Sequence, residues 1–208
     1  MIYDVLKNNN KKLDAFISAS GIGIYGAING SVICTEEMLP ANDFLGITCQ
    51  KWEAATNTIE SLGIRTVKIR TGLVLGSGDG FLKKLAPIFK LKLGAALGSG
   101  QQYMPWIHIN DLCAIYLEAL NNAKIDGVYN AAVTDNTTNT IFSKTLAKIY
   151  GYSIWLPNIP AFLIKTALGE MAQIILKGRR VSSKKIEKLG FEFQFSSIKD
   201  ALRDCLGK

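Results

Sequence analysis

The sequence holds little of the chemistry on which metal sites and disulfide frameworks depend. Its 208 residues include one histidine, His108, and four cysteines. The cysteines are Cys34, Cys49, Cys113 and Cys205, and none lies close enough in sequence to another to form a C-x-x-C pair. We therefore expect neither a metal site nor a disulfide framework.

Long apolar runs are also missing. The longest candidate for a membrane-spanning segment, residues 159–178, is interrupted by Lys165 and Glu170. The first residues, MIYDVLKNNNKK, lack the apolar stretch of a secretory signal peptide. These absences predict a cytoplasmic protein that has no membrane partner.

A concentrated basic arm is absent as well. The net charge is +7, but lysines and arginines are spread from Lys7 to Lys208, which argues against a nucleic-acid partner. The densest group is KGRRVSSKK, residues 177–185. It has two interpretations, a solvated surface or a contact with phosphate or nucleic acid, and the sequence leaves both open.

The patterns that are present alternate between strand and helix. Short apolar runs predict buried parallel strands at residues 15–18, 66–69 and 128–130, and helical periodicity fills the stretches between them. Strands that alternate with helices indicate an α/β fold with a parallel sheet.

Several element ends carry their own signals. Asp43 is predicted to start a helix that Gly63 ends, and Asn110 or Asp111 is predicted to cap the helix that follows PWIHI. Pro87 is expected to interrupt the helix in which it lies. A threonine or asparagine cap starts the helix within TTNTIFSKTLAKIYG. The pattern of the C-terminal residues predicts one long helix over residues 159–178, and after it a Phe-rich strand between two short helical pieces.

Four landmarks, in this order, resemble the extended, epimerase-like short-chain dehydrogenase/reductases. They are FISASGIGIYG, WEAA in the next helix, IRTGLVLGSGDG, and PWIHINDL followed by GVYNAA. The chain is similar, more narrowly, to a bacterial nucleoside-diphosphate-sugar epimerase-like subfamily sometimes labelled cell-division inhibitor. Residues 156–195 resemble the C-terminal segment of unknown function that marks this subfamily.

The resemblance implies a partial Rossmann-like parallel sheet and a smaller, mostly helical substrate lobe. Residues 1–75 and 107–132 would form the dinucleotide-binding part, and residues 76–106 and 133–208 the second lobe. NADP or NAD is the implied cofactor. The family's glycine-rich pyrophosphate loop is not found, because GIGIYG falls in what the resemblance assigns as the catalytic loop. We therefore expect the chain to be an N-terminally truncated member.

The family's catalytic pattern is also altered. Its Tyr-x-x-x-Lys pair falls near Leu45 and Cys49, and the Ser/Thr four residues before the Tyr of "YG" falls on Gly21. The arginine that grips a sugar-nucleotide phosphate in the family is replaced by Met104. These departures put a nucleotide-sugar substrate in doubt. Glu53 is predicted to lie on the surface or to pair with a neighbouring helix.

The resemblance still leaves candidate ligand contacts. Thr71, Gly72 and Leu73 lie in the loop after KIR, which passes the nicotinamide in this fold, and they would touch the cofactor mainly through their backbone. Ser20 and Tyr25 are the candidate catalytic residues beside it, although Tyr25 could equally be a packed aromatic with a hydrogen-bonded hydroxyl.

A second group of candidates faces the expected substrate lobe. It comprises Gln101, Trp106 and His108. Trp106 has a competing interpretation as a core residue, and His108 as a structural residue of its strand.

Two classes of function follow from these observations. One is an NAD(P)-dependent epimerase or oxidoreductase with atypical catalytic groups, acting on an unknown small molecule. The alternative is a non-catalytic module that binds a dinucleotide or a protein. The strand at residues 15–18, with Phe16 and Ile17, is expected to lie at an open sheet edge. That edge predicts either a homo-oligomer or a requirement for a separate N-terminal piece.

Overall fold

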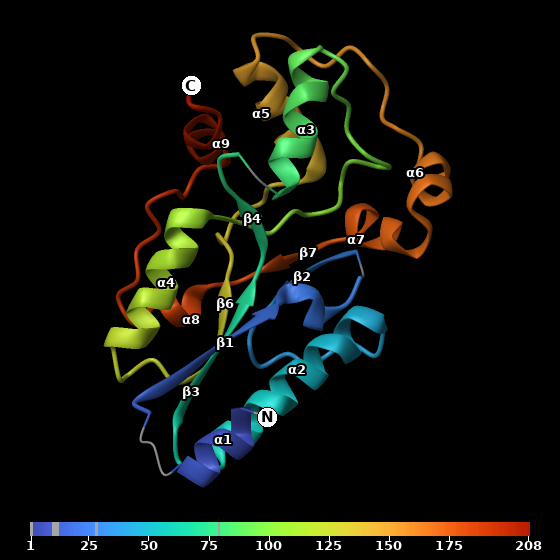
Figure 1. The fold of residues 1–208 in the computed structure, drawn as a ribbon. Helices are drawn as coiled ribbons and strands as arrows, with labels where there is room; N and C mark the ends of the chain where they lie inside the picture. The colour runs from blue at the N-terminus through green and yellow to red at the C-terminus, as the bar shows by residue number, and fades with distance from the viewer. Residues whose placement is uncertain (1, 10–12, 28, 79) are drawn as a thin grey trace.

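The computed structural model describes residues 2–9, 13–27, 29–78 and 80–208. Its central sheet contains β1 (Ala15–Gly21), β3 (Arg65–Thr71) and β6 (Gly127–Ala131), paired in the order β1–β3–β6 (Figure 1). Both pairings are parallel, with Ala15 beside Arg65 and Val67 beside Gly127. The predicted α/β fold with a parallel sheet is therefore confirmed.

Helices cover the two faces of this sheet. On one side lies α2 (Phe44–Glu60), with α1 (Ile2–Asn9) beside it, and on the other lies α4 (Ile109–Asn121) (Figure 1). As predicted, Asp43 caps α2, where its carboxylate accepts a hydrogen bond from the backbone N–H of Gly46 at 2.8 Å.

The cap of α4 differs from the prediction. The N-cap residue is His108, whose Nδ1 accepts from the backbone N–H of Asn110 at 3.2 Å. Asp111 is buried in the first turn, and its carboxylate accepts from the backbone N–H groups of Gln194 and Phe195 at 2.8 and 3.1 Å. The aspartate that looked like a local cap thus anchors a distant segment of the chain.

The second lobe is built from α3 (Gly80–Lys90), α5 (Asn139–Ile149) and α9 (Ile198–Leu206). Its helices surround a buried apolar cluster that includes Trp106, Phe142, Leu146 and Leu202. Thr138 caps α5, as predicted, by accepting a hydrogen bond from Ile141. The interruption expected at Pro87 is wrong, because α3 continues through that residue and ends at Lys90. A proline lacks one N–H donor, so α3 loses a single backbone hydrogen bond at Pro87, one turn before its end.

The single helix expected over residues 159–178 is also wrong. The structure has α6 (Ala161–Leu168), a 3-10 turn η2 (Gly169–Met171) and α7 (Ala172–Leu176). Gly169 has φ of 57°, a left-handed conformation that ends α6 and that glycine adopts at no steric cost.

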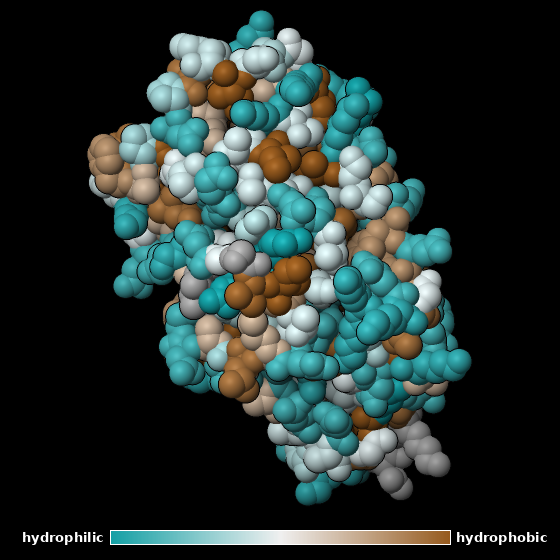
Figure 2. Space-filling model, turned by 180° about the vertical axis from the view of Figure 1, so that it is seen from behind, coloured by the Kyte–Doolittle hydropathy of each residue, from teal (hydrophilic) through white to brown (hydrophobic). Residues whose placement is uncertain are grey.

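The broken segment exposes apolar side chains. Phe162 is 64% exposed, Leu163 50% and Met171 67%. Figure 2 shows apolar surface at the left of that view, where α6 projects from the molecule.

Two further strand pairs were not anticipated. β2 (Gly30–Cys34) pairs in parallel with β7 (Arg179–Val181), and β4 (Leu73–Leu75) pairs in parallel with β5 (Trp106–His108). The β2–β7 pairing brings the segment after α7 back onto the sheet side of the molecule.

The Phe-rich stretch expected as a strand is irregular instead. It lies between α8 (Lys184–Glu187) and α9, and its phenylalanines pack against the cores. Ile186 and Val181 belong to the clusters around the sheet, so part of the region assigned to the second lobe packs with the first. The domain boundaries themselves stay a prediction.

β1 is the edge strand of the central sheet. Within the described ranges no strand pairs with its outer edge, and Phe16 and Ile17 are half-buried. The association expected at this edge stays a prediction. In the part of the chain that the structure describes, no helix combines the length and apolar character needed to cross a bilayer.

Candidate functional site

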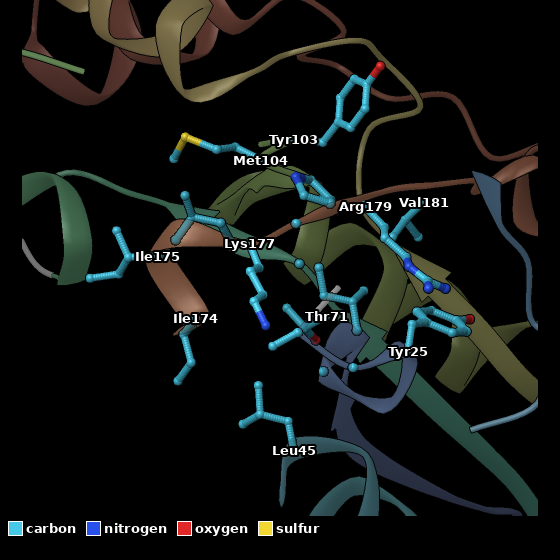
Figure 3. A pocket seen from close by; sticks show the side chains of 18 of the residues that line it. Tyr25, Leu45, Thr71, Tyr103, Met104, Ile174, Ile175, Lys177, Arg179 and Val181 are labelled. Atoms are coloured by element: carbon cyan, nitrogen blue, oxygen red, sulfur yellow. The ribbon is translucent and has the colours of Figure 1, made fainter. Parts of the chain in front are cut away.

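A pocket of about 340 Å³ opens where two parallel strands of the central sheet end. Its lining includes residues at both strand ends (Figure 3). Ile22 and Gly23 follow β1, Thr71 ends β3, and Gly72 and Leu73 come directly after it. Ligands of open α/β sheets bind at this carboxyl edge, and the volume lies at the lower end of the range for ligand sites.

The facing wall comes from distant parts of the sequence. α2 contributes Leu45, the loop before β5 contributes residues 103–105, and the segment from α7 to β7 contributes residues 174, 175, 177–179 and 181. Gly178 presses against this loop, because a Cβ at that position would collide with the carbonyl oxygen of Tyr103. The pocket therefore lies between the sheet and the second lobe, and most of its lining side chains are apolar.

The residues expected to touch the cofactor line the pocket, but two of their backbone donors are already used. The N–H of Gly72 donates to the carbonyl of Ala131 at 3.0 Å, and that of Leu73 donates to Pro105 at 2.8 Å. A Cβ on Gly72 would lie 2.8 Å from the Pro105 oxygen, which explains the glycine. Contacts from Thr71, Gly72 and Leu73 to a cofactor stay a prediction, and the N–H groups of Gly72 and Leu73 are not free to make them.

The two candidate catalytic residues belong to one hydrogen-bond network. Ser20 Oγ donates to Glu53 Oε1 at 2.8 Å, and Arg70 donates to both oxygens of the same carboxylate at 2.8 and 2.9 Å. Tyr25 accepts from Arg70 at 3.1 Å and donates to Asn130 Oδ1 at 2.7 Å. The network joins β1, η1 (Ile22–Tyr25), α2, β3 and β6.

The environment of this network keeps the Glu53 carboxyl ionised and the Tyr25 hydroxyl protonated. Burial would raise the pKa of the Glu53 carboxyl, but hydrogen bonds from Arg70 and Ser20 outweigh it and lower that pKa. Burial raises the pKa of Tyr25 despite the opposing charge of Arg70. Tyr25 is therefore a phenol whose proton is committed to Asn130.

The expectation that Glu53 lies on the surface or pairs with a neighbouring helix is wrong. Its side chain is 12% exposed, and its partner Arg70 lies on a strand, not on a helix. A carboxylate in this position needs its cation, because an unpaired charge in a partly buried site is costly.

Leu45 and Cys49, where the resemblance would put the family's Tyr and Lys, lie beside Gly23, and that assignment stays a prediction. A Cβ built on Gly23 would lie 3.4 Å from Leu45 Cβ and 3.7 Å from Cys49 Sγ. Burial raises the pKa of the Cys49 thiol, which keeps it neutral. Neither side chain supplies the fixed positive charge that a lysine would place there.

The three residues expected to face a substrate do not line this pocket. Gln101 is exposed on the loop before β5. Trp106 is fully buried and donates from Nε1 to Asp135 Oδ2 at 2.9 Å. His108 is buried at the start of α4, with Nε2 3.1 Å from Asp204 Oδ2. Both burials agree with the structural interpretations of Trp106 and His108, and a role toward a substrate stays a prediction for all three residues.

The sequence reasoning missed Leu45, Met104, Lys177 and Arg179 as lining residues. For Lys177 and Arg179 a signal was available, since both belong to the basic group at residues 177–185. For Met104 and Leu45 the sequence indicates only that they replace residues of the family's pattern.

Two family models match the sequence. Residues 2–132 match the NAD dependent epimerase/dehydratase family, and residues 159–205 match a domain of unknown function (DUF1731). The second match confirms the expected resemblance of the C-terminal segment.

Curated relatives cover nearly the whole chain. The chain is 34% identical over 202 residues to the epimerase family protein YfhF of Bacillus subtilis, and the aligned region covers 97% of this chain and 66% of that protein. It is also 34% identical over 204 residues to an Arabidopsis thaliana protein named as a chloroplastic homologue of epimerase family protein SDR39U1, of which 58% is covered. The chain thus spans about three fifths to two thirds of the length of these relatives.

Solved structures share the fold. The human epimerase family protein SDR39U1 with NADPH superimposes with a TM-score of 0.90 at 27% identity, covering 100% of this chain and 70% of that one. A nucleoside-diphosphate sugar epimerase from Corynebacterium glutamicum gives a TM-score of 0.80 at 30% identity, with 99% and 40% covered.

Proposed function

The chain belongs to the NAD dependent epimerase/dehydratase family, and from that premise we propose that it serves NAD(P)-dependent oxidoreductase chemistry of the epimerase type. The pocket is where a small, largely apolar substrate would meet the nicotinamide ring. The observation that carries this proposal is the position of the pocket at the carboxyl ends of β1 and β3, with Thr71–Leu73 as its inner wall.

The residues present fit the nicotinamide end of a dinucleotide. Gly23 and Gly72 present no side chain, Leu45 and Leu73 offer apolar faces, and Thr71 offers a hydroxyl. When bound, the cofactor supplies or accepts a hydride. A dinucleotide also has a pyrophosphate, for which the family uses the N-terminus of an α-helix. Here GIGIYG itself forms the 3-10 turn η1, so this stretch does not offer such a helix.

The proton step of this proposal does not use Tyr25. Its hydroxyl is occupied by Arg70 and Asn130, and its raised pKa opposes ionisation. Lys177 is a pocket-lining side chain that carries exchangeable protons, and Figure 3 shows it extending into the pocket toward Thr71.

A second function has its own support. The resemblance would put the family's proton-transfer pair at Leu45 and Cys49, and neither a leucine nor a neutral thiol could replace that pair. A module that binds the dinucleotide without turnover accounts for that difference. The two functions share the same binding site and differ in whether hydride leaves the cofactor.

Binding is tested by saturation-transfer NMR with NADPH. We expect the nicotinamide protons to receive more saturation than the adenine protons, with a Kd weaker than about 1 µM, or less than about 8 kcal/mol of binding free energy. Leu45→Trp fills the pocket and should abolish transfer to the nicotinamide. Ile47→Trp is the control, because Ile47 is 43% exposed on the same helix and does not line the pocket.

Absence of nicotinamide transfer in the wild-type chain, or equal transfer in Leu45→Trp, would contradict the proposed binding mode. The two functions are then separated by following nicotinamide absorbance with a panel of apolar aldehydes and ketones. Oxidation of NADPH that Leu45→Trp abolishes supports the enzyme, and a bound but unreactive cofactor supports the binding module.

A further inference from the structure

The pocket has an uneven charge composition. Lys177 and Arg179 line it, and among the described lining residues there is no aspartate or glutamate. Its remaining lining side chains are mostly apolar, including Leu45, Met104 and Ile174. Two cations facing an apolar chamber without an internal counter-charge indicate a ligand that brings the negative charge itself.

Within the residues that the structure describes, Arg179 has a hydrogen-bond donor that is left without a partner. Its Nε is buried and has no hydrogen-bond partner among the described residues. Its Nη1 has the Met38 sulfur at 3.9 Å and the guanidinium also interacts with the Cys34 thiol, and both sulfur groups are weak acceptors. Leaving a buried guanidinium donor unpaired costs free energy, which an incoming anion would recover.

Lys177 stands two residues away on the same extended stretch. Its Nζ contacts Gln173 Oε1 at 3.4 Å and pairs with no carboxylate in the described part of the chain. Since side chains alternate along an extended chain, Lys177 and Arg179 share one side while Gly178 packs against Tyr103 on the other. Both line the pocket, and Figure 3 shows Lys177 extending toward Thr71 and Arg179 toward Tyr25.

We propose that Lys177 and Arg179 form an anion subsite, and that the substrate is an apolar molecule carrying one carboxylate. This deepens the proposed function, on which the word substrate rests. A planar guanidinium suits a carboxylate because it can donate two parallel hydrogen bonds, and the neighbouring ammonium adds a second charge. The uncharged wall formed by Leu45, Met104 and Ile174 would take the apolar body.

A matched pair of probes tests the subsite without any cofactor. 2-Naphthoate and 2-naphthamide share an apolar body and differ in charge, and each is titrated into the full chain by NMR. We expect 2-naphthoate to bind at least tenfold more tightly, a difference of about 1.4 kcal/mol. Arg179→Met should reduce this preference to within twofold, and Lys177→Met should reduce it in part.

Two control variants distinguish binding at the subsite from a non-specific attraction to the net positive charge of the protein. Lys188→Met also removes one cation, from an exposed position at the end of α8, and should keep the tenfold preference. Leu45→Trp should weaken both probes, which places them in the pocket. If Arg179→Met does not fold, Lys177→Met decides, because Lys177 is exposed.

Equal affinity for the two probes, binding of neither, or a preference that survives both Arg179→Met and Lys177→Met would overturn the proposal. A loss of preference in Lys188→Met as well would also overturn it, since the attraction would then be non-specific. Because no cofactor is present, a failure to bind NADPH would count against the proposed function and leave this result unchanged.

Discussion

Two arginines near the end of the sheet differ in their hydrogen-bond and ion-pair partners. Arg70 is 5% exposed and donates to both oxygens of Glu53 and to the hydroxyl of Tyr25. Arg179 is half-buried, has an unpaired Nε, and lines the pocket. An arginine whose donors are used inside the protein supports the fold, and one whose donors are left over beside a cavity is available to a ligand. The comparison predicts that changes around Arg70 affect stability, whereas a change at Arg179 affects binding.

The largest effect is expected from Glu53→Gln, which leaves Arg70 without its counter-charge in a buried place. Removing one partner of such a pair should lower the free energy of unfolding by about 3 kcal/mol. The urea midpoint measures this loss, with the slope of the transition unchanged.

Glu60→Gln is the matched control on the same helix. Glu60 pairs with Lys68 at 3.3 Å, but its side chain is 55% exposed, so the loss should stay below about 1 kcal/mol. Equal losses in the two variants would show that the Arg70 pair is no more important than a surface pair.

Tyr25→Phe should have the next largest effect. It removes the hydroxyl between Arg70 and Asn130, so a buried donor and a buried acceptor both lose a partner, at a cost of about 2 kcal/mol. Saturation transfer from the protein to NADPH should be unchanged. Loss of NADPH binding or of turnover in a folded Tyr25→Phe variant would restore Tyr25 as a catalytic residue.

Acid should weaken the same network. The folded-state pKa of Glu53 is lowered below its unfolded value, so its contribution is fully present above the unfolded pKa. It is lost as the pH falls through the folded pKa, because the unfolded chain then binds the proton more readily. Urea midpoints measured from pH 7 downward should fall more steeply for the wild type than for Glu53→Gln, and parallel curves would argue against this assignment.

The smallest effect on stability is expected from Arg179→Met. Since Arg179 has no ion partner among the described residues, the free energy of unfolding should change by no more than about 0.5 kcal/mol. The urea midpoint tests this directly. A loss comparable to that of Glu53→Gln would mean that both arginines support the fold, and the comparison would fail.

Features set by neighbouring residues could be read from the sequence. Asp43 caps α2 because its carboxylate reaches an N–H three residues away, and Thr138 caps α5 in the same way. The buried runs that became β1, β3 and β6 were recognisable from their composition and their glycine boundaries.

Predictions failed where a distant partner competed with the local one. Asp111 has the position of a cap, but the backbone of Gln194 and Phe195 takes its carboxylate. β2 and β7 are short and nearly 150 residues apart, and each becomes a strand only through the other.

By itself, the sequence determined the parallel α/β fold and the segment Thr71–Leu73 at the end of a central strand, because buried strands and their terminal glycines are local signals. Only the tertiary structure decided which polar side chains are free. Arg70 and Arg179 look alike as sequence, but one folds against Glu53 and the other faces a cavity. Whether a charge is neutralised depends on groups brought together through space and on the water removed around them, and neither is encoded in a residue's own neighbours.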